Sequence, residues 1–237
     1  NQFSIYLKEK KIHKGDRIAG ILPNIPETVI SFLSCAKIGA IWSSCSADFG
    51  PVAILDRFKQ INPKVLIVSD VYYYNNKKVE TLNKVDEILK KLPSIKEIII
   101  IPYDHRSKKQ YKLNYNFTNW EEIFDKIYEQ KLPYYEKFDF NLPLYILFSS
   151  GTTGKPKCIV HGAGGSLIQH KKEHALHCNI SESDKVFYFT TCGWMMWNWL
   201  VSCLASKATI YLYDGSPFFP TLNSLFKIIE KEKITFF

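Results

Sequence analysis

The sequence predicts a layered α/β fold in which a parallel sheet is covered by helices on both faces. Short apolar runs rich in β-branched residues alternate with longer runs of helical spacing along most of the 237 residues. Continuous apolar strands separated by helices are typical of parallel sheets that are buried on both sides. The 46% of hydrophobic and 15% of aromatic residues suffice for a large core, which excludes a disordered chain.

The individual elements follow from these two periodicities. The β-rich runs predict strands at 17–22, 64–69, 97–101, 144–148, 158–160, 186–190, 208–213 and from 234 onward. The longer runs predict helices at 26–38, 51–61, 78–92, 119–131, 166–176, 195–206 and 221–231. The first of these helices has Pro26 in its first turn and Gly39 just past its end. Its predicted apolar stripe consists of Val29, Ile30, Leu33 and Ala36.

The pattern loosens between about 102 and 142, where Tyr, Asn and Lys dominate around a single helix. This stretch is the candidate for a surface excursion or a subdomain seam. The chain begins without Met and ends at Lys233–Phe237, which has the pattern of a strand just begun. We therefore expect 1–237 to be one incomplete domain that is cut at both ends. No run approaches the ~18 to 20 apolar residues of a membrane span, and residues 1–14 do not have the pattern of a secretory signal.

Charge and cysteine usage narrow the function classes. The formal charge of +8 comes from 31 Lys and Arg against 23 Asp and Glu, but the basic residues are scattered among acidic ones. A solvated surface explains this pattern better than a nucleic-acid-binding patch, although a basic cleft could attract a polyanion such as ATP or CoA. The six cysteines show no CxxC pair and mostly lie in apolar runs, which favours buried thiols in a cytoplasmic protein and no metal site.

A candidate phosphate loop follows the predicted strand at 144–148, where ligands bind in parallel α/β sheets. It consists of Ser149, Ser150, Gly151, Thr152, Thr153, Gly154, Lys155, Pro156 and Lys157. Glycines allow close backbone approach to a phosphate, while hydroxyls, backbone N–H groups and lysines supply donors and charge. The Walker spacing and GxGxxG are absent, and Pro156 with the following β-branched residues prevents a helix there. On composition alone, a tight hairpin turn between two strands is the favoured interpretation.

The order of these nine residues resembles the SGTTGxPK signature of the adenylate-forming superfamily, which includes acyl-CoA synthetases, luciferases and peptide-synthetase adenylation domains. The resemblance implies that the loop binds the β- and γ-phosphates of ATP. It also implies an αβαβα N-terminal AMP-binding domain, followed in complete members by a small C-terminal domain that is absent here. ATP, CoA and Mg²⁺ are the cofactors it implies. The resemblance places the later motifs of the superfamily beyond Phe237, so we expect residues 1–237 to contain no complete set of catalytic residues.

A second segment, Phe187 to Asn198, is dense in aromatic and Met side chains. Such a cluster is usually core. It nevertheless follows a predicted strand and resembles the acyl-pocket motif of the superfamily, which is GWxTG in acetyl-CoA synthetases. The version here, with Ile159–Gly162 before it and Leu212–Pro217 after it, resembles the acetoacetyl-CoA synthetase branch. By that resemblance the acyl pocket consists of Gly193, Trp194, Met195, Met196 and Trp197, and Lys77 is a candidate for CoA binding against the simpler interpretation of a solvated helix face.

Three functions remain open from the sequence. The first is a part of an acid-thiol ligase that activates acetoacetate through an acyl-adenylate, with residues 1–237 inactive alone. The second is an acetate- or propionate-type acyl-CoA synthetase. The third, from another class, is a noncatalytic nucleotide-binding module. The expected partner is a small carboxylic acid, with no nucleic acid and no membrane span.

Overall fold

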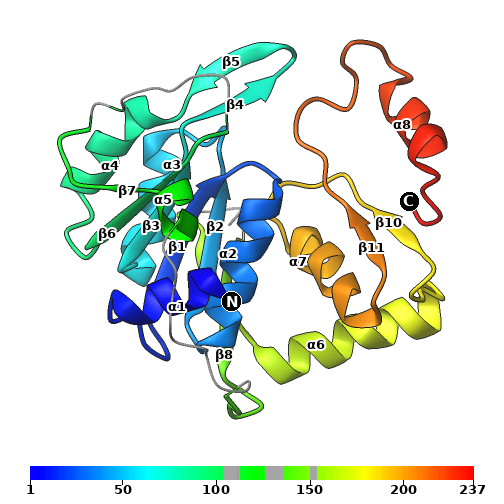
Figure 1. Ribbon diagram of the computed structural model, residues 1–237, viewed down its shortest axis with the longest axis horizontal. Helices are drawn as coiled ribbons and strands as arrows, with labels where there is room; N and C mark the ends of the chain where they lie inside the picture. Colours follow the sequence, from blue (N-terminus) through cyan, green and yellow to red (C-terminus); the bar gives the residue numbers. More distant parts are fainter. Residues whose placement is uncertain (104–110, 112, 126–135, 150–153) are drawn as a thin grey trace.

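The computed structural model describes residues 1–103, 111, 113–125, 136–149 and 154–237. A seven-stranded sheet forms the centre of the larger lobe (Figure 1), with the strand order β7-β6-β3-β1-β2-β8-β9. All neighbours are parallel except β8 and β9, which are antiparallel. Its strands are β1 (Arg17–Leu22), β2 (Ile41–Ser46), β3 (Val65–Ser69), β6 (Glu97–Ile101), β7 (Thr118–Asn119), β8 (Pro143–Ser149) and β9 (Lys157–Gly162).

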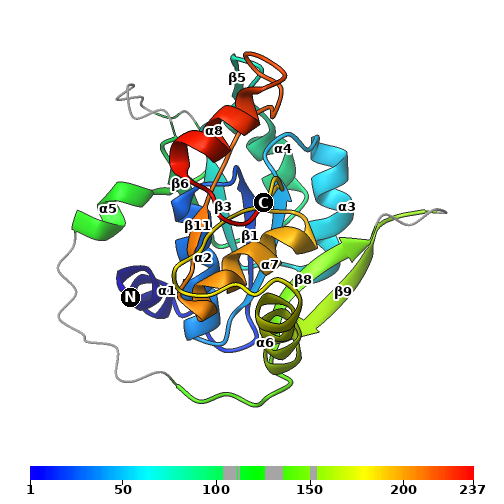
Figure 2. The same ribbon diagram turned by 90° about the vertical axis from the view of Figure 1, so that its right-hand side faces the viewer.

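Helices cover both faces of this sheet, as the sequence predicts. They are α1 (Gln2–Glu9), α2 (Pro26–Lys37), α3 (Pro51–Ile61), α4 (Val85–Lys90) and α5 (Trp120–Asp125). Figure 2 shows α3 and α4 on one side of the sheet and α1 and α5 on the other. Successive strand residues point to opposite faces. In β3, Val65 and Ile67 therefore join the core under α1, α2 and α5, whereas Leu66 and Val68 join the core under α3 and α4.

The smaller lobe is built on a second parallel sheet. Its elements are α6 (Ala163–Lys172), the π-helix η2 (Glu173–His177), β10 (Lys185–Phe187), α7 (Met195–Ser202), the 3-10 helix η3 (Cys203–Ser206), β11 (Thr209–Tyr211) and α8 (Ser224–Glu232). β10 pairs with β11, and Phe236 forms a parallel bridge to Val186 on the other side of β10. The predicted strand from 234 onward is thus present as one bridge. Trp199 and Leu200 of α7 pack on this sheet in a third core cluster.

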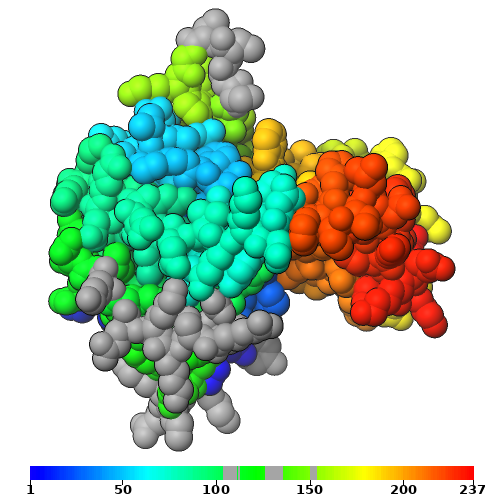
Figure 3. Space-filling view, turned by 90° about the horizontal axis from the view of Figure 1, so that it is seen from above, coloured from blue at the N-terminus to red at the C-terminus, as the bar shows by residue number. Residues whose placement is uncertain are grey.

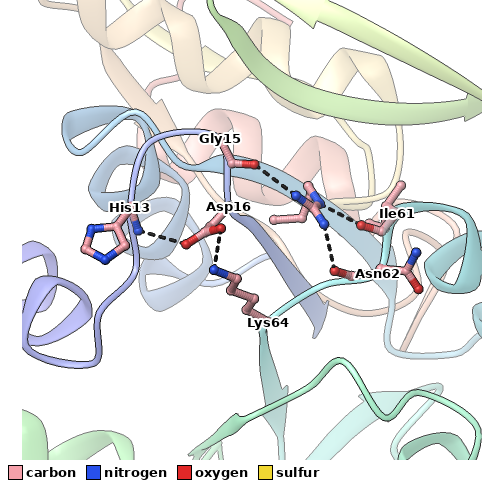
Figure 4. A network of polar contacts seen from close by, with 7 residues as sticks. His13, Gly15, Asp16, Ile61, Asn62 and Lys64 are labelled. Atoms are coloured by element: carbon pink, nitrogen blue, oxygen red, sulfur yellow. Dashed lines mark hydrogen bonds and ion pairs between the residues drawn. The ribbon is translucent and has the colours of Figure 1, made fainter.

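A polar network fixes the amino ends of β1 and β3 (Figure 4). Lys64 Nζ lies 2.7 Å from Asp16 Oδ1, and the His13 backbone N–H donates to Asp16 Oδ2 over 2.9 Å. Burial raises the pKa of Asp16, but these contacts outweigh it and hold the pKa below its ordinary value. Arg17 donates to the carbonyls of Gly15, Ile61 and Asn62 in the same network. This edge of the sheet is therefore tied together by polar contacts among its own residues.

Two sequence predictions about local structure are wrong. Residues 78–92 are not one helix, because β4 (Val71–Tyr74) and β5 (Lys77–Glu80) form a hairpin before the 3-10 helix η1 (Leu82–Lys84) and α4. Asn75 and Asn76 both have positive φ, as a two-residue type I′ turn requires.

The predicted stripe of α2 is also wrong, because Ile30 and Leu33 are exposed. Val29 of that stripe does contact the core, and Phe32 and Cys35 join it there. Thr28 and Ser31 are buried beside them and donate their hydroxyls to the carbonyls of Pro23 and Glu27. Among the described residues, no helix is long and apolar enough to cross a bilayer.

Candidate functional site

The phosphate loop connects two paired strands. Ser149 at the end of β8 pairs with Lys157 at the start of β9, so the loop closes a β-hairpin that extends from the sheet (Figure 2). The hairpin interpretation of the sequence is therefore correct for the connection, and it leaves phosphate binding open as a prediction. Ser150, Gly151, Thr152 and Thr153 lie outside the described residues.

The described end of the loop is held by α3. Gln60 Nε2 donates to the Pro156 carbonyl over 2.7 Å, and Lys155 Nζ lies 3.7 Å from Asp56 Oδ1. Lys155 and Lys157 are both exposed, and a Cβ placed on Gly154 would meet nothing within 4 Å. An exposed ion pair of this kind contributes little energy. Among the described residues, both ammonium groups and the backbone at Gly154 therefore remain accessible to a polyphosphate, which fits the predicted ligand.

The aromatic segment lies at the carboxyl end of β2. A Cβ placed on Gly193 would lie 3.4 Å from Ser46 N, so the chain passes close to that strand. Trp194 is 62% exposed and Met195 is 44% exposed, while Met196 packs against the core of the smaller lobe. Trp197 is completely buried. The five predicted pocket residues therefore differ in environment, and only the first part of the segment presents side chains to solvent.

Hydrogen bonds that sequence reasoning missed hold this segment in place. The Cys192 thiol donates to the Leu22 carbonyl over 2.8 Å, and Ser44 Oγ donates to the Cys192 carbonyl over 2.6 Å. Burial raises the pKa of Cys192, which keeps it a neutral thiol able to donate. Asn24, two residues past the end of β1, accepts from Trp197 Nε1 over 2.8 Å. The position of Asn24 just past a buried strand is the signal that could have identified it.

A cavity of about 80 Å³ lies between the two lobes at the carboxyl ends of their strands. It is lined by Pro23, Asn24, Ser46, Ala47, Asp48, Tyr72, Tyr73, Tyr74, Phe189, Thr190, Thr191, Tyr213, Asp214 and Gly215. Tyr103 Oη donates to Asp214 Oδ2 over 3.0 Å. Burial raises the pKa of Asp214, and this hydrogen bond opposes the rise. The cavity is thus a polar and aromatic junction.

Lys77 lies on β5, in the hairpin whose other strand supplies three tyrosines to the cavity. Its side chain is exposed, on a strand and not on the predicted helix face. Figure 3 shows this cyan hairpin beside the orange part of the smaller lobe, where a Cβ on Gly215 would lie 4.0 Å from the Tyr73 carbonyl oxygen. The hairpin therefore borders the junction between the lobes.

The carboxyl edge of the large sheet brings the phosphate loop and the predicted acyl-pocket segment together. β8 runs parallel beside β2 with Trp42 paired to Tyr145, and Ser43 Oγ donates to the Ile146 carbonyl over 2.9 Å. Ser149 and Ser46 therefore end neighbouring strands at the same edge, and Gly193 packs on Ser46. Ligands bind at this edge in open parallel sheets.

Comparison with known proteins agrees with this arrangement. The family described as "AMP-binding enzyme" matches residues 1–237, the whole chain. The chain belongs to the AMP-binding enzyme family.

Several relatives of this chain share one name, acetoacetyl-CoA synthetase. "Acetoacetyl-coenzyme A synthetase" of Rhizobium meliloti (strain 1021) is 48% identical over 231 residues, covering 98% of this chain and 35% of that protein. "Acetoacetyl-CoA synthetase" of Macaca fascicularis is 44% identical over 236 residues, with the same two coverages. The solved structure "Acetoacetyl-CoA Synthetase from Streptomyces lividans" superposes with a TM-score of 0.91 at 39% identity, covering 99% of this chain and 35% of that one. The chain thus spans about a third of the length of these AMP-binding relatives.

The AMP-binding family match confirms the predicted fold class, the layered α/β domain with a mainly parallel sheet. The family does not by itself assign the individual site residues, which stay predictions. Within the described ranges, no group of three or more His, Cys, Asp or Glu side chains could hold a metal ion.

Proposed function

We propose that this chain is part of an acid-thiol ligase that activates acetoacetate with ATP and transfers the acyl group to CoA. The observation that carries the proposal is the agreement of relatives from a bacterium, a primate and a nematode. All are named acetoacetyl-CoA synthetase, and each matches at least 97% of this chain at 37% to 48% identity. The Gly193–Asn198 segment, which departs from the acetate-type GWxTG motif, supports the same substrate.

The proposed roles follow from position and chemistry. Lys155, Lys157 and the backbone around Gly154 bind the β- and γ-phosphates, where their charge offsets the negative charge that develops on the departing pyrophosphate. Trp194, Met195 and Met196 hold the acyl group so that its carboxylate attacks the α-phosphorus in line. The resulting acyl-adenylate is cleaved by the CoA thiolate, which releases AMP. Lys77 is proposed to contact the CoA nucleotide, and the protein is proposed to act in the cytoplasm.

Substrate-dependent pyrophosphate release by the full-length protein tests this proposal. We expect kcat/KM for acetoacetate to exceed that for acetate and for propionate, and residues 1–237 alone to release none above background. A preference for acetate or propionate would move the protein to the other short-chain branch. Release of no pyrophosphate with any of the three acids, while ATP still binds, would leave a noncatalytic nucleotide-binding module.

A further inference from the structure

Asn24 connects three segments that are far apart in the sequence. It lies two residues past the end of β1, and its side chain is buried. Its Oδ1 accepts from Trp197 Nε1 over 2.8 Å, and its Nδ2 donates to the Tyr213 carbonyl over 3.3 Å. Both ends of this amide are therefore engaged, one by α7 and the other by the segment after β11.

Trp197 is the residue of the aromatic segment that makes a side-chain hydrogen bond to Asn24. Its ring is fully buried and lies edge-on to Phe32, with 5.7 Å between the ring centroids. A buried indole N–H needs an acceptor, because an unsatisfied buried donor is costly. Asn24 supplies that acceptor. Trp197 lies in the first turn of α7, directly after the residues proposed to face the acyl group.

The acetate-type motif GWxTG has glycine at the position of Trp197. A glycine has no indole to anchor and no donor for Asn24. A buried side chain that packing and a hydrogen bond hold in one position restricts where the backbone beside it can lie. The hydrogen bond between Asn24 and Trp197 is therefore possible in this chain and not with the GWxTG motif. It differs between the two motifs without being a contact with the acyl group.

We propose that Asn24 is a positioning residue for acyl selection: through Trp197 it fixes the start of α7 and so sets where Trp194 to Met196 meet a short 3-oxo acid. This inference rests on the proposed function. Asn24 acts through Trp197, and Trp197 supports the pocket from the core side. A small displacement of the helix start changes how well an acid of a given length is oriented, which alters kcat/KM for one acid more than for another.

Four variants of the full-length protein test the proposal: Asn24→Ala, Trp197→Phe, the double variant, and Ser43→Ala as the matched control. Ser43 also makes a buried hydrogen bond, to the Ile146 carbonyl, but it belongs to β2 and β8. We expect Asn24→Ala and Trp197→Phe each to lower the ratio of kcat/KM for acetoacetate to kcat/KM for acetate by about tenfold. A tenfold change corresponds to about 1.4 kcal/mol of discrimination between the two acids. The double variant should lower the ratio no further than the more impaired single variant, since both substitutions break the same Asn24–Trp197 hydrogen bond. Ser43→Ala should keep the wild-type ratio.

Hydrogen exchange of the same variants gives a measurement that does not depend on activity. In Asn24→Ala and in Trp197→Phe, amides at the start of α7 should exchange faster than in the wild type, while those of α3 stay unchanged. A wild type that shows no preference for acetoacetate defeats the proposed function, and the exchange data still test the anchor. A wild type that prefers acetoacetate, with variants that keep that ratio or leave α7 exchange unchanged, overturns the inference. Loss of folding by Asn24→Ala alone does not protect the inference, because Trp197→Phe removes the indole N–H while it keeps an aromatic ring at the buried position.

Discussion

At the scale of single residues, the glycines show where close packing leaves no room for a side chain. A Cβ placed on Gly20 in β1 would lie 2.7 Å and 2.9 Å from two ring carbons of Trp42, which is fully buried. We expect Gly20→Ala to lower the free energy of unfolding by about 1 to 3 kcal/mol through this overpacking. Urea denaturation measures the difference.

Gly165→Ala is the matched control, because a Cβ there would meet nothing within 4 Å and the residue lies inside α6. Alanine in a helix interior is expected to raise the free energy of unfolding by about 0.5 to 1 kcal/mol. Equal stability of the Gly20→Ala protein and the wild type would show that Trp42 moves aside at no cost.

At the scale of elements, two histidines join α6 and η2 to the helices packed beside them. His170 Nδ1 lies 2.9 Å from Ser202 Oγ, and His174 Nε2 lies 3.3 Å from Cys203 Sγ. Burial lowers the pKa of both histidines, although Glu173 opposes the shift. Burial also raises the pKa of Cys203 to about 12, so the thiol stays neutral. Burial therefore favours the neutral form of both imidazoles at this contact between helices.

This gives a pH dependence of stability with a definite sign. In the unfolded chain these histidines take up protons at about pH 6.5, whereas in the folded protein their lowered pKa delays protonation to a lower pH. The unfolded state thus binds more protons as the pH falls, and the free energy of unfolding should decrease from about pH 7 to about pH 5.5. His174→Gln, which cannot titrate, should flatten that decrease. Thermal unfolding at several pH values measures it, and an unchanged slope in the variant would contradict the assignment to His174.

At the scale of the whole molecule, contacts at the carboxyl edge hold the two lobes together. Tyr103 follows β6 in the larger lobe, and Asp214 follows β11 in the smaller lobe. Because burial raises the pKa of Asp214, its charged form depends on the hydroxyl of Tyr103 and on the Asn24 backbone N–H. The lobes are therefore joined by a carboxyl group whose charge is only partly compensated.

Tyr103→Phe should destabilise the protein by about 1 to 2 kcal/mol near neutral pH, since it removes one of the hydrogen-bond donors to the half-buried carboxylate of Asp214. A carboxyl pKa that is raised on folding stabilises the protein at low pH, and this contribution is lost as the pH rises through the folded pKa. The variant raises that pKa further, so its deficit should grow from about pH 4 to about pH 7. Urea denaturation across this range measures the deficit. The exposed Tyr74→Phe is the control, and a deficit independent of pH would remove Asp214 from the explanation.

The sequence predicts those features that depend on neighbouring residues. Strands β1 and β6 and helix α3 have the predicted bounds, because their apolar periodicity is local and continuous. β2 escaped prediction because three of its six residues are serines. Only in the folded chain do Ser43 and Ser44 find the carbonyls of Ile146 and Cys192, which makes a buried serine strand stable.

By itself, then, the sequence determined the layered α/β class, the position of the phosphate loop after a strand, and the resemblance that the family match confirms. Each of these features depends only on the order of residues along the chain, which the sequence gives directly. Only the tertiary structure decided that Trp197 is buried and that its partner is Asn24, 173 positions earlier. No local pattern specifies that pair, because the contact exists only when the end of β1 and the start of α7 are brought to one edge by the packing of both lobes.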